Sequence, residues 1–488
     1  MKLLEVDMHL SSEEVLSIAL DKQFLPRSYY EFYKAGFHVV EPSTPFVDNW
    51  VIRYLCDRLQ KEVERIMRRQ TRKKHLVINI PPRFGKSNIV TVFLNAWSWI
   101  HYPSLKFISV SYSGSLSEDH SIKTKELIDS TWYQMRFGDS FRMSVRKNTN
   151  KIFRNTMGGA RVSTSVGGGI TGKGGNIIIL DDAIDPQKAV SDAERKKTNR
   201  WIGSSLSNRL NEPEIDMFVF VQQRVHEDDA VGHVVAKDPS KYEMIVVPAE
   251  HTYPITPDFL RQYYRDGLLD PVRFPRHVLQ DLKISMGSQA YAGQFGQQPK
   301  AMEGNIFKQS WFQVISASQY QQRVGLYRPK VDFFLDTAYT DNERNDPTAL
   351  GAFVWFGNTL YVLSVANKWM EFPELKKFAP QFCIDNGYDN RSIMEVEPKA
   401  SGISVCQEIK RETGLNVVLG PAPKDSKTVR ANSVTAFCEA GRVVLVDGSW
   451  VPGFLDQLTT FPNASHDDMA DILVNAIRRY NKPIRTVS

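Results

Sequence analysis

The amino-acid sequence predicts an α/β protein with two domains, a mainly parallel sheet in the first and a mixed sheet in the second. The 488 residues exceed the length at which a single hydrophobic core stops growing. From Val40 to about Ala249, apolar runs typical of strands alternate with helical patterns, which favours a parallel sheet covered on both faces. From about residue 326, a strand, a hairpin, a helix and another strand follow in turn, which favours a separate mixed sheet.

Changes in this pattern give the expected domain boundaries. Residues 1–40 are expected to form a small helical appendage, residues 41–251 the first domain and residues 326–480 the second. Residues 252–325 are rich in Pro, Gly, Gln and Tyr and are interpreted as an extended connection packed against both domains, and residues 481–488 form a basic tail.

Short apolar runs rich in β-branched residues define the strands of the first domain. They cover residues 76–80, 106–112, 176–180, 217–222 and 243–249. The second domain is expected to contain a strand over 331–339, a hairpin of 348–356 and 359–367, a helix over 373–386, a strand over 392–397 and a final amphipathic helix that starts near residue 467.

Composition indicates a soluble globular protein, with 42% apolar and 24% charged residues. The four cysteines are scattered without a C-x-x-C pair, which argues against a zinc site and against a disulfide framework. The most apolar long window, Ile89 to Ile100, is too short to cross a membrane, and the acidic N-terminus does not resemble a signal peptide. A cytoplasmic protein without membrane contact is expected.

Positive charge is concentrated in one segment. Between Arg58 and Lys74 there are eight basic and two acidic residues, against a net charge of +6 for the whole chain. A helix of this kind either contacts nucleic acid or a neighbouring subunit, or simply presents a solvated face. The sequence favours neither alternative.

The first candidate site is the run LVINIPPRFGKS, from Leu76 to Ser87. A strand leads into a loop in which Gly85 permits close backbone approach, Lys86 supplies a positive charge and Ser87 a hydroxyl for Mg²⁺, as a nucleotide phosphate tail requires. Ile80 stands where the usual spacing has a first glycine. An ordinary turn before a helix is the alternative.

A second run, NIIILDDAID, supports the nucleotide interpretation. A buried strand places Asp181 and Asp182 at its carboxyl end, where ligands bind in open α/β sheets. Asp181 is expected to hold Mg²⁺, and Asp182 to polarise the attacking water. The alternative is a strand followed by an acidic turn. The polar run Gln222 to Asp229 follows the next strand, and its consecutive acids are poorly arranged for a metal.

The acids of the second domain form a further constellation. Asp336 lies near the end of the strand VDFFLDTAY, Glu397 ends the strand SIMEVE, and Asp467 and Asp468 open the last helix. Three carboxylates that converge can hold two Mg²⁺ or Mn²⁺ ions about 4 Å apart around a phosphodiester. Each acid also has a structural alternative: a strand end, an ion pair or a favourable charge at a helix N-terminus.

Several of these runs together resemble the large terminase subunit of tailed bacteriophages, the ATPase and nuclease that packages DNA into an empty capsid. The resemblance extends from about Phe37 to the end of the final helix. It rests on PPRFGKS, SVSYSGSLSEDHS, GGGITGKGGN before LDD, QQRVHEDDAVGH, AYAGQFGQQP, VEPKASG and HDDMAD.

The resemblance implies an N-terminal P-loop ATPase domain and a C-terminal ribonuclease H-like nuclease domain. The residues it implies for ATP phosphates are Arg83, Gly85, Lys86 and Ser87, with Asp181 on Mg²⁺. Asp182 stands where family members often carry a glutamate. The implied nuclease ligands are Asp336, Glu397 and either Asp467 or Asp468, with Asp346 as an outer ligand and Glu395 as a poorer candidate.

The resemblance also implies partners and a location. Family members act as a ring of subunits around double-stranded DNA, with a small terminase subunit and a portal protein as partners, at the portal vertex of the procapsid in the host cytoplasm. A trans-acting arginine is expected, and Arg161 and Arg224 are candidates.

Two other functions account for the first domain. One is a helicase-like or remodelling ATPase with an inert C-terminal domain, which predicts ATP hydrolysis without DNA cleavage. The other is a nucleotide-switched DNA-binding assembly scaffold, which predicts nucleotide-dependent association with negligible turnover. Neither explains three separated acid clusters in the second domain.

Overall fold

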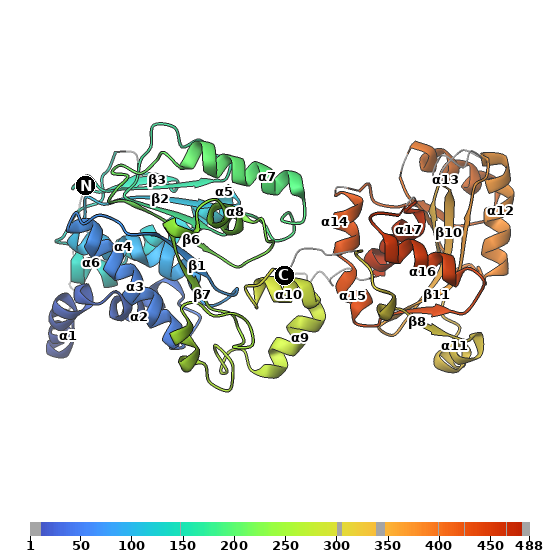
Figure 1. Ribbon diagram of the computed structural model, residues 1–488, viewed down its shortest axis with the longest axis horizontal. Coiled ribbons are helices and arrows are strands. Elements are labelled where there is room, and N and C mark those ends of the chain that lie inside the picture. Colours follow the sequence, from blue (N-terminus) through green and yellow to red (C-terminus); the bar gives the residue numbers. More distant parts are fainter. Residues whose placement is uncertain are drawn as a thin grey trace. The chain divides into compact units, whose positions relative to one another are not determined.

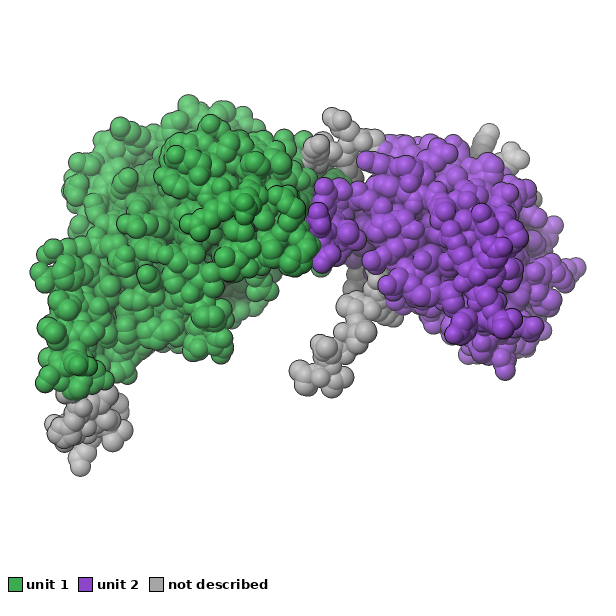
Figure 2. All heavy atoms as spheres, turned by 90° about the horizontal axis from the view of Figure 1, so that it is seen from below, with its two compact units in different colours: residues 1–279, 289–301 green, residues 280–288, 302–488 purple. Residues whose placement is uncertain are grey.

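The computed structural model describes residues 11–146, 148–299, 305–337, 347–398, 400–423, 425–464 and 466–480. The chain divides into two compact units, coloured separately in Figure 2. The first comprises Met1–Leu279 with Gln289–Ala301, and the second comprises Gln280–Ser288 with Met302–Ser488. Each unit is built around its own seven-stranded sheet (Figure 1).

The sheet of the first unit has the order β3-β4-β2-β5-β6-β1-β7. Its strands are β1 (His75–Asn79), β2 (Lys106–Ser111), β3 (Ile152–Arg154), β4 (Ala160–Ser165), β5 (Ile177–Asp181), β6 (Met217–Gln222) and β7 (Tyr242–Val246). Every neighbouring pair is parallel except β3 and β4. The predicted mainly parallel sheet is confirmed.

The helices of the chain up to residue 294 lie in the first unit, except that residues 280–288 belong to the second. They are α1 (Ser12–Phe24), η1 (Leu25–Arg27), α2 (Tyr29–Val40), α3 (Trp50–Met67), η2 (Asn88–Phe93), α4 (Leu94–His101), α5 (Gly114–Asp129), α6 (Thr131–Phe137), α7 (Asp192–Trp201), η3 (Ile202–Leu206), α8 (Ala230–Lys237), η4 (Pro239–Lys241), η5 (Asp258–Tyr263), α9 (Arg276–Met286) and α10 (Ser288–Gln294).

Both faces of this sheet are buried, which explains why its strands are apolar throughout rather than alternating. On β5, Ile177 and Ile179 join the larger core beneath α2, α3 and α4. Ile178 and Leu180 point the other way, into a second core covered by η3 and α8. Asp181 continues the alternation and therefore faces the side of the larger core.

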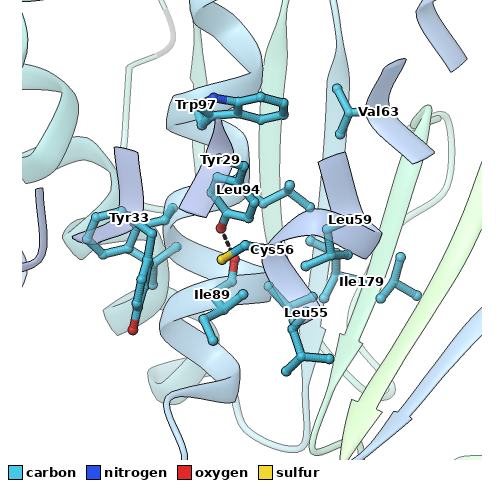
Figure 3. Close-up of a cluster of buried hydrophobic side chains, with 14 of the residues drawn as sticks. Tyr29, Tyr33, Leu55, Cys56, Leu59, Val63, Ile89, Leu94, Trp97 and Ile179 are labelled. Atoms are coloured by element: carbon cyan, nitrogen blue, oxygen red, sulfur yellow. Dashed lines mark hydrogen bonds between the residues drawn. The ribbon is translucent and has the colours of Figure 1, made fainter. Parts of the chain in front are cut away.

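The helix α2 is part of the larger core. Tyr29, Phe32 and Tyr33 on α2 are 0–1% exposed and pack in that core. Tyr29 also donates a hydrogen bond to the backbone carbonyl of Ile89 (Figure 3). The predicted helices are present from residue 12 onward, and α1 has no buried residue. The appendage prediction is wrong for α2, because its aromatic face is buried against the helix that follows the β1 loop.

Several arginines of the basic segment form ion pairs within the first unit. Arg58 forms a two-pronged ion pair with Glu243, at 2.8 and 2.6 Å. Arg65 pairs with Glu62 on the same helix at 2.7 Å, and Arg69, just after α3, with Glu212 at 2.5 Å. Arg58 therefore ties α3 to β7, which gives part of this charge a structural role.

The sheet of the second unit has the order β13-β12-β9-β10-β11-β14-β8. Its strands are β8 (Gln313–Ile315), β9 (Asp332–Asp336), β10 (Thr348–Phe356), β11 (Thr359–Lys368), β12 (Met394–Val396), β13 (Val417–Leu419) and β14 (Val443–Val446). β10 is antiparallel to β9 and β11, and the other pairs are parallel. The predicted mixed sheet and its hairpin are confirmed.

Helices cover both faces of this sheet, with α12 and α13 on one side and α16 and α17 on the other (Figure 1). The helices are η6 (Gln309–Trp311), α11 (Ala317–Val324), α12 (Phe372–Asp385), α13 (Ala400–Glu412), α14 (Lys427–Asn432), α15 (Thr435–Glu439), α16 (Val451–Thr460) and α17 (Asp468–Tyr480). On β9, Phe333 and Leu335 face the α12 side and Phe334 faces the α17 side.

The expected connection over residues 252–325 is divided between the two units. Its residues up to Leu279 and from Gln289 to Ala301 belong to the first unit. Ile306, Phe307 and Phe312 pack in a core of the second unit, and β8 forms an edge of its sheet. The segment therefore contributes to both folds.

The structure also bears on the cysteines and on membrane-spanning helices. All four cysteines are buried free thiols, as predicted. Among the described residues, no helix combines the length and the apolar character that a membrane crossing requires.

We expect Phe32→Ala to lower the free energy of unfolding of the first unit by about 3–5 kcal/mol, because the truncation leaves a cavity in a closed core. Urea unfolding followed by fluorescence and circular dichroism measures this change. Leu16→Ala on α1 is the matched control, since Leu16 is 61% exposed. Equal, small effects of both substitutions would contradict the assignment of α2 to the core.

Candidate nucleotide and metal sites

The loop after β1 has the backbone expected of a phosphate-binding turn. Arg83 and Gly85 adopt left-handed conformations, with φ of 69° and 75°. A Cβ atom on Gly85 would lie 3.3 Å from the hydroxyl oxygen of Tyr33, so glycine suits this position in both conformation and space. Helical turns begin at Lys86 and continue through η2 and α4. The side chain of Arg83 is exposed.

The structure brings the two predicted halves of this site together. β6 lies between β1 and β5 in the sheet, and all three strands are parallel, so their carboxyl ends meet at one edge. Ser87 and Thr91 donate hydrogen bonds to the carboxylate of Asp181 at 3.1 and 2.7 Å. The ammonium nitrogen of Lys86 lies 2.9 Å from Oδ2 of Asp182.

Asp182 is held by its backbone as well as by this ion pair. Its φ of 46° is left-handed, a conformation that aspartate adopts more often than most residues other than glycine. The backbone N–H of Gln223, at the end of β6, donates to Oδ1 of Asp182 at 3.1 Å. The end of β6 therefore holds the carboxylate of Asp182 beside Lys86.

Burial controls the charges around these acids. It raises the pKa of Asp181 and of Asp182 above the usual range, against the opposing charge of Lys86. Burial lowers the pKa of His120 to about 4, so this imidazole is neutral at pH 7, 3.7 Å from Asp181. Burial also lowers the pKa of Arg161 to about 9, which leaves its guanidinium charged at pH 7.

The two candidates for a trans-acting arginine are both held inside this subunit. Arg161 is fully buried and donates a hydrogen bond to the backbone carbonyl of Thr91 at 2.6 Å. Arg224 pairs with Asp229 at 2.9 Å, and Asp229 also caps α8 through the N–H of Gly232 at 3.0 Å. Each arginine is bound by groups of its own chain.

In the second unit, three acids from distant parts of the sequence meet. Asp336, Glu397 and Asp471 are buried, and each offers one carboxylate oxygen within 4.8 Å of the other two. β9 and β12 are parallel neighbours, and the N–H of Glu397 donates to the carbonyl of Leu335 at 3.0 Å. Side-chain alternation turns both strand acids toward α17, which carries Asp471.

The third member of this cluster differs from the sequence-based prediction, which named Asp467 or Asp468. Asp467 precedes α17 and forms an ion pair with Lys427. Asp468 is the first residue of α17 and is buried, but it is not in the cluster. Asp471 lies one helical turn further on. The sequence does contain a signal for Asp471: it is an acid within the apolar face of an amphipathic helix, and a buried charge requires partners.

Glu395 is occupied elsewhere, although it shares its strand face with Glu397. Its carboxylate forms an ion pair with Arg479. This agrees with its lower rank as a candidate ligand. Asp346 lies outside the described residues.

Two cations from α14 hold the acidic cluster. Arg430 is 5% exposed, and its guanidinium donates to Oε1 of Glu397 and to Oδ1 of Asp471, both at 3.1 Å. The ammonium of Lys427 lies 3.0 Å from Oδ2 of Asp471. Burial raises the pKa of Asp471, against the opposing charges of Lys427 and Arg430. Three converging carboxylates are a donor set that suits a hard divalent cation such as Mg²⁺ or Mn²⁺.

Part of the second unit matches a known family model. Residues 386–479 match the family model described as the terminase RNaseH-like domain. The resemblance to large terminase subunits and the predicted ribonuclease H-like fold are thereby confirmed for the domain that contains Glu397, Arg430 and Asp471. No curated protein matches the sequence of the chain.

Solved structures similar to this chain include large terminases at low sequence identity. The large terminase of a thermophilic bacteriophage aligns with a TM-score of 0.48 and 11% identity, over 86% of this chain and 98% of that one. The large terminase of bacteriophage HK97 aligns with a TM-score of 0.37 and 11% identity, over 92% and 99%. The nuclease domain of the bacteriophage SPP1 large terminase, with bound Mn, aligns with a TM-score of 0.26 and 13% identity, over 35% and 96%.

We expect Asp471→Asn to abolish the stabilisation of the terminase RNaseH-like domain by Mn²⁺, and Asp467→Asn to leave most of it. The reason is that Asp471 is in the three-acid group and Asp467 is not. At a hundredfold excess over the dissociation constant, a bound ion stabilises a folded protein by about 2.7 kcal/mol. Thermal unfolding with and without Mn²⁺ measures the difference. The reverse order of the two variants would restore Asp467 as the ligand.

Proposed function

We propose that this chain is the motor and nuclease subunit of a viral DNA-packaging machine. It hydrolyses ATP to move double-stranded DNA into a procapsid and cuts concatemeric DNA with a two-metal endonuclease. The observation that carries the proposal is that one chain holds a Lys86–Ser87–Asp181–Asp182 site on a parallel sheet and a buried three-acid cluster in a terminase RNaseH-like domain.

The nucleotide site explains how hydrolysis begins. Lys86 is paired with Asp182 at 2.9 Å, and this pair has to open for the ammonium to reach the ATP phosphates. Asp182 then becomes available to orient and polarise the attacking water. Ser87 and Asp181, 3.1 Å apart, would hold the Mg²⁺ that accompanies ATP and neutralises its phosphate charge.

The acidic cluster explains cleavage. Two divalent cations held by Asp336, Glu397 and Asp471 would supply Lewis-acid activation of the phosphodiester and of a water molecule. The chain's own contribution is a rigid frame: two parallel strand ends fix Asp336 and Glu397, and α17 brings Asp471 to them. Burial on this frame keeps the ligand oxygens close together before substrate arrives.

The proposal includes partners and a place of action. Double-stranded DNA is the substrate, gripped through its phosphates largely without sequence readout. A homo-oligomeric ring, a small terminase subunit and a portal protein complete the assembly at the portal vertex, in the host cytoplasm. These elements follow from the resemblance to large terminases.

The alternatives account for less of the chain. A helicase-like translocase without nuclease activity, or a nucleotide-switched scaffold, uses only the first unit. In either case the gathering of Asp336, Glu397 and Asp471 on three separate elements would have no function. Buried carboxylates are costly, and such clusters are retained where they bind a ligand or a cation.

We expect Lys86→Ala to lower the rate of ATP hydrolysis by at least about a hundredfold, because it removes the ammonium that is proposed to stabilise charge on the phosphates. Release of inorganic phosphate measures this rate. The variant should still cut plasmid DNA in Mn²⁺, since the cluster lies in the other unit. Wild-type hydrolysis at the rate of the variant would favour the scaffold.

We expect Asp336→Asn to abolish plasmid cleavage in Mg²⁺ and in Mn²⁺, because it removes a ligand charge from the cluster. ATP hydrolysis, measured on the same preparation, should be unchanged and serves as the control for folding. Equal cleavage by wild type and variant would locate the nuclease elsewhere, and no cleavage by wild type in either metal would favour the pure translocase.

A further inference from the structure

Arg430 occupies the acidic cluster in a way that a merely structural ion pair does not require. Its two terminal nitrogens reach two different members of the cluster, Oε1 of Glu397 and Oδ1 of Asp471, each at 3.1 Å. The side chains of all three residues are at most 5% exposed. A planar guanidinium thus bridges two carboxylates in the position where a bridging cation is also expected.

Electrostatics makes this arrangement competitive with metal binding. Three carboxylates with oxygens within 4.8 Å of one another repel strongly in a buried site. Arg430 and Lys427 supply two positive charges that offset this repulsion. A divalent cation at the same oxygens would supply an equal charge in a smaller volume, so the two sources of positive charge exclude each other from Glu397 and Asp471.

A cavity lies next to Arg430 and the acidic cluster. Its volume is about 660 Å³, and both Glu397 and Arg430 line it together with Arg478 and Arg479. Asn475, which also lines this cavity, already has its side-chain oxygen 3.4 Å from Nη1 of Arg430. A guanidinium that leaves the carboxylates therefore remains at the wall of an open cleft, where Arg478 and Arg479 stand beside the acids Glu395 and Asp425.

We propose that Arg430 exchanges partners. Without metal it neutralises Glu397 and Asp471; a divalent cation displaces it, and the freed guanidinium then binds a backbone phosphate of DNA in the adjoining cleft. This inference rests on the proposed nuclease function and adds a residue to it. It makes metal binding and DNA binding mutually supportive, because each removes a competitor of the other.

The first test measures metal affinity rather than cleavage. Isothermal titration of the full chain with Mn²⁺ compares wild type, Arg430→Gln and Arg430→Lys. We expect Arg430→Gln to bind Mn²⁺ about tenfold more tightly or better, since a unit charge close to the site is removed. Arg430→Lys should lie between the two, because an ammonium keeps the charge but loses the two-pronged bridge. Because Arg430→Lys keeps the positive charge beside the acids, it still tests the proposal if Arg430→Gln does not fold.

Arg479→Gln is the matched control. Arg479 lines the same cleft and pairs with Glu395 on the same strand face, but not with the cluster. Its removal should leave Mn²⁺ affinity within about twofold of wild type. Affinity that is unchanged or weaker in both Arg430 variants would overturn the exchange, since Arg430 would then support the ligands instead of competing with metal.

The second test concerns the phosphate contact. The affinity for a short DNA duplex is measured over a range of salt concentrations, without metal and with Ca²⁺. A gel run after each measurement shows whether the duplex was cut, and only measurements with intact duplex are used. With Ca²⁺, Arg430→Gln should reduce the slope of log affinity against log salt by about one. Without metal, the slope should equal that of wild type. An unchanged slope in both conditions would overturn the contact.

These outcomes are separable from failure of the nuclease proposal itself. If wild type and Asp336→Asn bind Mn²⁺ equally, the cluster is not the metal site, and the proposed nuclease centre fails together with the exchange. If wild type binds Mn²⁺ through Asp336 while Arg430→Gln gains no affinity, the nuclease centre stands and only the exchange is overturned.

Discussion

Both candidate sites depend on one constraint: a carboxylate buried at the end of a strand must be matched by a nearby positive charge. The cost of burying an isolated carboxylate is large, and it falls only when a cation and hydrogen bonds are present. In the first unit Lys86 forms an ion pair with Asp182, and the hydroxyls of Ser87 and Thr91 donate hydrogen bonds to Asp181. In the second unit Arg430 forms ion pairs with Glu397 and Asp471.

Sheet topology determines where this constraint applies. In each unit the acids lie at the ends of strands whose other residues alternate between two buried cores, so the acids are largely buried as well. The side on which an acid emerges follows from its parity along the strand. Asp181 thus meets the helix after β1, and Asp336 and Glu397 meet α17.

The sequence carried the information about strands and strand ends, but not about partners across the fold. The runs 348–356 and 217–222 coincide with β10 and β6, because apolar, β-branched composition is a local property. The position of Asp471 depends instead on the rotation of α17 against the sheet, and that of Arg430 on the packing of α14 against α17. These are tertiary relations between residues more than 30 positions apart, and no local pattern encodes them.

The role of α2 shows the same limit: its aromatic face was visible in the sequence, but its partner was not. Tyr29 donates to the carbonyl of Ile89 and Tyr33 lies beside Gly85, so an element that looks peripheral in the sequence supports the nucleotide loop.

A common logic follows for the two sites. Each is neutralised from within, by Lys86 in one unit and by Arg430 with Lys427 in the other. In the proposed function, a ligand that brings its own positive charge, such as a metal ion, takes over the acids, and Lys86 and Arg430 turn to the phosphates of the substrate. On this proposal the same ion pairs stabilise the folded site and, when they open, supply the contacts to phosphate.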